Sequence, residues 1–99
     1  MRLTPIQQQQ IRQAVHEVFG PRALVRVFGS RLKDDVRGGD LDLLVAIDEP
    51  IDHPARLAAA LSARVSRAMD GRRVDVLVSA PGLRRLPIHD VADRENVPL

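Results

Sequence analysis

Two aspartates at the head of an apolar run, in residues 40–47, limit what this chain can be. Asp40 and Asp42 lead into Leu43-Leu44-Val45-Ala46-Ile47. A short apolar run of this kind is typical of a buried strand. Aspartate is depleted in strands, because its short charged side chain neither fills a pleated surface nor tolerates burial. Something must therefore compensate the two carboxylates, and the expected partner is a cation.

Length and composition restrict the class of protein. The 99 residues predict a single domain over 1–99, with one core and no second lobe. With no Trp and no Tyr, the core must consist of Leu, Val, Ile and Ala. The absence of Cys excludes a disulfide scaffold and cysteine-ligated zinc, and favours a cytoplasmic protein. No apolar run approaches the roughly 18–20 residues of a membrane span, so no membrane association is expected.

The basic residues point to no nucleic-acid site. Fifteen Lys and Arg stand against thirteen acids, for a net charge of +2. The arginines are scattered and no aromatic residues are interleaved to stack on bases, so direct nucleic-acid binding is not expected. The three histidines share no metal-ligand spacing, and surface or helix-capping roles are predicted for His16, His53 and His89.

Three helices are predicted from their start and stop signals. Thr4 as N-cap, Pro5 at the first helical position and Gln7 closing a capping box begin the first helix, which ends at Gly20-Pro21. The second helix is expected to begin at the N-cap Asp52 and to end at 70–71. A short third helix is predicted over about 83–95, with Asn96 near its C-cap and residues 97–99 left over.

Strands are expected at 23–28, 40–47 and 73–79, from their β-branched and apolar content. With the three helices and a short helical turn expected at Gly29-Ser30-Arg31, they give an α/β (α+β) fold in the order αβαβαβα, with a three-stranded mixed sheet and helices packed mainly on one face. The second and third strands are joined through a helix and should be parallel. The first and second are joined more directly and can be antiparallel.

This topology brings the acids together. Side chains alternate across a strand, so Asp40 and Asp42 share one face, about 6.5–7 Å apart. A parallel third strand places Asp75 beside them, and an antiparallel first strand ends there with Gly29-Ser30. Clustered carboxylates select Mg²⁺ or Mn²⁺, and two such ions stabilise the oxygens of phosphoryl or nucleotidyl transfer. Backbone N–H groups that follow a glycine can bind phosphate.

These residues resemble a known family. Gly29-Ser30, then Asp40-x-Asp42, then a strand carrying Asp75 is similar to the signature of the DNA polymerase β-like nucleotidyltransferase superfamily, and most of all to the minimal nucleotidyltransferases (MNT). The resemblance implies that Asp40, Asp42 and Asp75 are catalytic and hold two Mg²⁺ ions, with Mn²⁺ as a substitute; Asp75, the third carboxylate, is a shared metal ligand or the general base. It makes Gly29, Ser30 and Arg31 contacts of the ATP triphosphate.

The resemblance also implies a partner. Minimal nucleotidyltransferases are often antitoxins of HEPN ribonuclease toxins, and some transfer AMP from ATP to a toxin tyrosine. The implied function is a protein adenylyltransferase antitoxin, acting with a HEPN-type toxin encoded nearby in a homo- or hetero-oligomer. The alternative is a catalytically silent antitoxin that masks its toxin. A partner surface is expected beside the acids, as an apolar patch of Leu44, Ala46 and Leu77.

Overall fold

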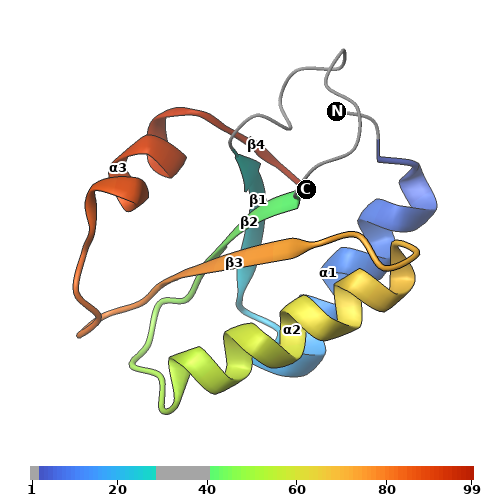
Figure 1. Cartoon of the computed structure of the whole chain (residues 1–99). Helices are drawn as coiled ribbons and strands as arrows, with labels where there is room; N and C mark the ends of the chain where they lie inside the picture. The colour runs from blue at the N-terminus through green and yellow to red at the C-terminus, as the bar shows by residue number, and fades with distance from the viewer. Residues whose placement is uncertain (1–2, 29–40) are drawn as a thin grey trace.

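The protein has a layered fold, in which a β-sheet carries helices on both of its faces (Figure 1). The structure, a computed structural model, describes residues 3–28 and 41–99. Along the chain lie α1 (Pro5–Phe19), β1 (Leu24–Phe28), β2 (Leu41–Ala46), α2 (Pro54–Ala68), β3 (Val74–Ser79), α3 (Pro87–Arg94) and β4 (Asn96–Pro98). The sheet has four strands in the order β3-β2-β1-β4, whereas the sequence predicted three. Helices α1 and α2 lie together on one face and α3 lies on the other.

The first helix begins and ends as predicted. The Thr4 hydroxyl accepts a hydrogen bond from the Gln7 N–H at 3.0 Å, and the Gln7 side chain accepts one from the Thr4 N–H at 2.9 Å. This reciprocal capping box satisfies two N–H groups that a helix start leaves without partners. The helix ends at Gly20, whose φ of 104° is accessible to a glycine without strain.

The start of α2 differs from the prediction. The N-cap is His53 and not Asp52, and it makes no side-chain capping bond. His53 has a φ of 55°. Proline disfavours the helical region for the residue before it, so Pro54 at the first helical position explains why His53 is not helical. The helix ends close to the predicted place, where Gly71 has a φ of 82° and its N–H donates to the Ser66 carbonyl at 2.8 Å.

The strand directions are confirmed. Strand β1 pairs antiparallel with β2, and β2 pairs parallel with β3. Two of these registers matter for the site: Phe28 lies opposite Asp42, and Asp42 lies opposite Asp75. One row across the sheet therefore carries an aromatic ring and two carboxylates.

The C-terminal segment differs most from the prediction. Helix α3 begins at Pro87 and not near residue 83, because a proline with a fixed φ and no N–H fits the first position of a helix. It ends at Arg94, and the side-chain amide of Asn96 then donates to the carbonyls of Ala92 (2.7 Å) and Asp93 (3.0 Å). This cap turns the chain back toward the sheet.

The residues left over after Asn96 form the edge strand β4. Val97 lies opposite Val27, and Pro98 lies opposite Arg26, in an antiparallel pairing with β1. The Leu99 N–H donates to the Val25 carbonyl at 3.2 Å, so the residues on either side of Pro98 face β1 and Pro98 faces away. A proline is tolerated at such an outward edge position because its missing N–H breaks no ladder bond.

Two apolar clusters hold the layers together. The main one fills the space between the sheet and α1 and α2; its most deeply buried members are Ile11, Val15, Val27, Leu41, Leu43, Val45, Leu61 and Val65. The second, under α3, consists of Phe28, Leu44 and Ala92 with Leu77 packed against them. Leu44 is only 2% exposed, so the predicted apolar patch is wrong at Leu44, because α3 covers it. Within the described residues, no helix is long and apolar enough to cross a membrane.

Candidate functional site

Two of the predicted acids lie side by side at one end of the sheet. Asp42 and Asp75 each occupy the second position of their strand and are direct partners in the parallel ladder. Neighbouring strands are about 4.8 Å apart, and partners in register point to the same face. Their face is the α3 side, because Phe28 and Leu44, which share it, pack with Ala92 of α3. The predicted convergence of Asp42 and Asp75 is therefore confirmed.

The Asp42–Asp75 pair is partly exposed to solvent and has a charged neighbour. Asp42 is half-buried, and the Asp75 side chain is 49% exposed. The Arg73 guanidinium lies 3.5 Å from the Asp75 carboxylate, since residues two apart on a strand share a face. Among the described residues, this corner therefore brings together two carboxylates and the Arg73 guanidinium.

The remaining predicted site residues, Gly29, Ser30, Arg31 and Asp40, lie outside the residues that the structure describes. Their roles stay predictions. In the described ranges, 3–28 and 41–99, no three acids or histidines are grouped so that they could hold a metal ion.

The two described acids nevertheless fit a divalent cation. Like charges placed directly opposite each other in a sheet are destabilising, and a cation between them removes that cost. Carboxylate oxygens are the ligands that Mg²⁺ prefers. The chemistry of the Asp42–Asp75 pair thus agrees with a Mg²⁺ site that would take further ligands from elsewhere.

An apolar pocket of about 370 Å³ opens next to the acids. It lies between the sheet and α3, and its lining consists of the two carboxylates and five apolar residues: Phe28, Val76, Leu77, Ile88 and Val91. The α3 wall is accessible from outside, because Ile88 is 43% exposed. A pocket of this kind suits an apolar or aromatic group whose polar end reaches the carboxylates.

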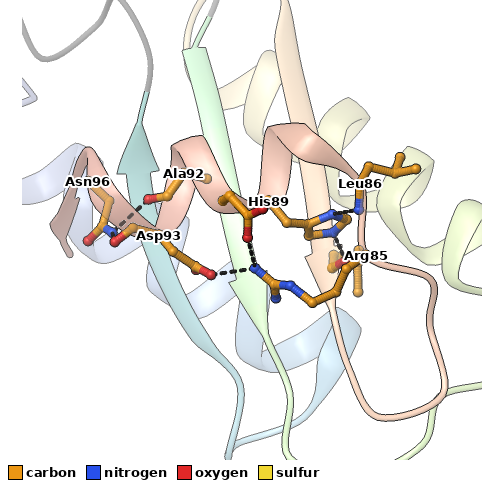
Figure 2. A network of polar contacts seen from close by, with 8 residues as sticks. Arg85, Leu86, His89, Ala92, Asp93 and Asn96 are labelled. Atoms are coloured by element: carbon orange, nitrogen blue, oxygen red, sulfur yellow. Dashed lines mark hydrogen bonds and ion pairs between the residues drawn. The ribbon is translucent and has the colours of Figure 1, made fainter.

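His89 fastens α3 to the sheet beside this pocket (Figure 2). Its Nδ1 accepts a hydrogen bond from the Leu86 N–H at 2.9 Å, and its Nε2 lies 3.0 Å from the Val78 carbonyl oxygen. An N–H can only donate and a carbonyl can only accept, so the ring is neutral with its proton on Nε2. His89 is only 4% exposed. The prediction of a capping role for His89 is confirmed, and the bond to Val78 adds a tie to β3.

An ion-pair network lies on the outer side of α3 (Figure 2). The Arg85 guanidinium donates to the Asp93 carboxylate at 2.5 Å and to the Asp90 carboxylate at 3.2 Å. These hydrogen bonds, with Asp93 contributing most, raise the pKa of Arg85 above its ordinary value. The network is exposed, so it orients the segment before α3 more than it stabilises the fold.

Sequence reasoning missed Arg73, the α3 wall of the pocket and the second bond of His89. A signal for one of them was present. Arg73 stands two residues before Asp75 and so had to share its face. The wall of the pocket and the bond from His89 to the Val78 carbonyl had no signal, because both depend on how α3 sits on the sheet.

Solved structures of similar fold are toxin–antitoxin complexes. A chain in the complex of a tri-AMPylated Shewanella oneidensis HEPN toxin with an MNT antitoxin matches with a TM-score of 0.63 and 16% identity, over 94% of this chain and 68% of that chain. A chain in a toxin–antitoxin crystal structure with AMP-PNP matches with a TM-score of 0.67 and 17% identity, over 92% and 70%. At this identity the likeness concerns the fold.

The sequence itself gives the family. Among curated proteins, none matches this chain significantly. The family model of the nucleotidyltransferase domain matches residues 9–95, which include β1, β2 and β3 and therefore both described acids. The chain belongs to the nucleotidyltransferase domain family.

Proposed function

We propose that this chain is a metal-dependent nucleotidyltransferase that moves AMP from ATP to a hydroxyl group of a partner protein, as the antitoxin of a HEPN-type toxin. The observation that carries the proposal is the Asp42–Asp75 pair, two carboxylates in direct register on one sheet face. Membership of the nucleotidyltransferase domain family supports the reaction class.

The proposed reaction is the transfer of AMP from ATP to an acceptor hydroxyl. The acceptor oxygen attacks the α-phosphorus of ATP, a new P–O bond forms, the bond between the α- and β-phosphates breaks, and pyrophosphate leaves. Asp75, half-exposed at the pocket mouth, takes the acceptor proton as general base. Asp42 is the less exposed of the two and fixes the geometry from the inner strand. Gly29, Ser30 and Arg31 are proposed to hold the triphosphate.

Asp40, Asp42 and Asp75 are proposed to hold two Mg²⁺ ions, which when bound would stabilise the charge on the attacking and leaving oxygens. The placement of Asp42 and Asp75 side by side supports this assignment, since carboxylate oxygens are the ligands that Mg²⁺ prefers.

The toxin partner is proposed from two kinds of support. Chains of similar fold belong to complexes of a HEPN toxin with an MNT antitoxin, and one such toxin is tri-AMPylated. In addition, the pocket beside the acids is lined by apolar side chains, which suits a protein side chain better than a phosphate.

The test is a transfer assay with two labels. The chain is incubated with Mg²⁺ and a HEPN-type toxin encoded beside it, with ATP labelled at either the α- or the γ-phosphate. Nucleotidyl transfer labels the toxin from α-labelled ATP only. Asp42→Asn should abolish labelling, whereas Asp48→Asn, an exposed acid paired with Arg22 beyond the other end of β2, should not. Labelling from γ-labelled ATP would contradict the proposal.

The alternative is a silent antitoxin that masks its toxin by binding. It is favoured by the same apolar pocket, which is suited to a protein contact whether or not transfer occurs. Toxin inhibition that survives Asp42→Asn at full strength, without labelling by the wild-type chain, would establish this alternative.

A further inference from the structure

Strand β3 is an edge of the sheet, and its outward backbone groups can be identified. The Leu41 N–H donates to the Arg73 carbonyl and the Ile47 N–H to the Ser79 carbonyl, both at 2.9 Å. Backbone groups alternate in direction along a strand, so the odd-numbered residues of β3 bond to β2. Val74, Val76 and Val78 therefore direct their N–H and C=O groups outward.

Side chains from two helices occupy the ends of this edge. The Ser62 hydroxyl, from α2, donates to the Val74 carbonyl at 2.5 Å. The His89 Nε2–H, from α3, donates to the Val78 carbonyl at 3.0 Å. In the described part of the chain, no such bond is made to the outward N–H and C=O of Val76. An edge strand guarded at both ends and open in the middle accepts only a short added strand.

Val76, the position left open on this edge, lies next to the Asp42–Asp75 pair. The Val76 side chain packs against the core cluster on the α1 and α2 face. Val76 nevertheless lines the pocket on the opposite face, so it reaches that pocket at the strand edge. Asp75 precedes it by one residue and lines the same pocket. A chain segment bonded to Val76 would thus pass directly by the Asp75 carboxylate.

We propose that the partner protein presents its acceptor hydroxyl on an extended segment that pairs with the edge of β3 through the N–H and C=O of Val76. In either pairing direction, the segment residue next to the one opposite Val76 lies opposite Asp75, where side chains of paired residues are about 4.5–5.5 Å apart. That residue carries the hydroxyl, and Asp75 accepts its proton. This inference rests on the proposed function and adds the form in which the substrate binds.

The chemistry of the edge favours a peptide over a nucleotide. One N–H and one C=O side by side complement the main chain of an extended peptide, as in strand addition to sheet edges. The apolar lining from Leu77 and Ile88 suits the carbon atoms of a peptide side chain.

The test compares two proline variants of the same edge. Val76→Pro removes the outward N–H and keeps the bonds of β3 to β2, because proline is tolerated where an edge N–H points away from the sheet. Val78→Pro makes the same change at the next outward position, farther from Asp75. We expect kcat/KM for labelling of the toxin to fall about two- to tenfold in Val76→Pro, the effect of one lost hydrogen bond, and far less in Val78→Pro.

Amide exchange of the unsubstituted chain gives a second readout, which does not depend on folding of a variant. Complex formation with the toxin should slow exchange of the Val76 N–H at least about tenfold, with or without ATP. Labelling of the toxin without this protection, or equal loss of kcat/KM in the two variants, overturns the inference and leaves the proposed function standing. Protection of the Val76 N–H without any labelling of the toxin refutes the proposed function. It also refutes the inference that the paired segment presents an acceptor hydroxyl.

Discussion

Removal of the His89 side chain should destabilise the protein by loosening α3. His89→Ala deletes the hydrogen bonds to the Leu86 N–H (2.9 Å) and the Val78 carbonyl (3.0 Å). An intramolecular hydrogen bond contributes about 0.5–1.5 kcal/mol net, so the two together contribute about 1–3 kcal/mol. For a domain of this size, 1 kcal/mol corresponds to a change in Tm of about 4–8 °C. The Tm of His89→Ala should therefore fall by about 4–24 °C.

Thermal unfolding followed by circular dichroism measures this change. The matched control is His16→Ala, which removes an exposed histidine from α1 and should change stability by less than about 0.5 kcal/mol. Amide exchange should be faster throughout α3 in His89→Ala, while the exchange of α1 stays as in the parent protein. Nitrogen NMR of the parent protein should show the proton on Nε2 of His89.

Two results would refute this reasoning. Equal changes in Tm for His89→Ala and His16→Ala would mean that the two hydrogen bonds contribute nothing measurable. A neutral ring with its proton on Nδ1 would be incompatible with a bond from the Leu86 N–H.

Three further changes test other parts of the structure. Asp42→Asn should lower transfer at least about 100-fold, since it removes a proposed metal ligand, while the Tm without metal stays equal or rises because repulsion from Asp75 is relieved; severe unfolding would make the acid structural. The hydrogen bond from Arg64 holds the pKa of Glu17 below its ordinary 4.5, so this stabilisation is present above that pH and is lost as the pH falls through the lowered pKa. The Tm difference between the parent protein and Glu17→Gln should thus shrink on acidification, and a constant difference would contradict the ion pair. Leu61→Ala, at a fully buried position, should cost about 2–5 kcal/mol in denaturant unfolding, and a cost under 1 kcal/mol would contradict its place in the core.

Much of the fold could be read from local signals. The capping box of α1 depends on residues three apart, so Thr4 and Gln7 were enough to predict it. The two-residue period of a strand placed Asp75 on the face opposite Val74 and Val76. Helical crossover between β2 and β3 required parallel pairing, which brought Asp42 and Asp75 together.

The start of α2 and the edge strand β4 were not predictable in the same way. Asp52, two residues before Pro54, is a good N-cap by composition. The chain nevertheless enters α2 through His53, whose backbone lies in the left-handed region. Strand β4 has only three residues, one of them Pro98. Its signal is too weak for periodicity, and it exists because β1 offers an unpaired edge next to the end of α3.

The sequence by itself determined the N-cap of α1, the strand directions and the convergence of the two acids, because these follow from a capping box, from the two-residue period of a strand and from the parallel pairing that a helical crossover requires. Only the tertiary structure decided which surface lies beside those acids. Docking of α3 buries Leu44, forms the pocket wall with Ile88, and places His89 on the edge of β3. The physical reason is that α3 packs through side chains distant in the sequence, so its position depends on the whole assembled sheet and not on its own residues.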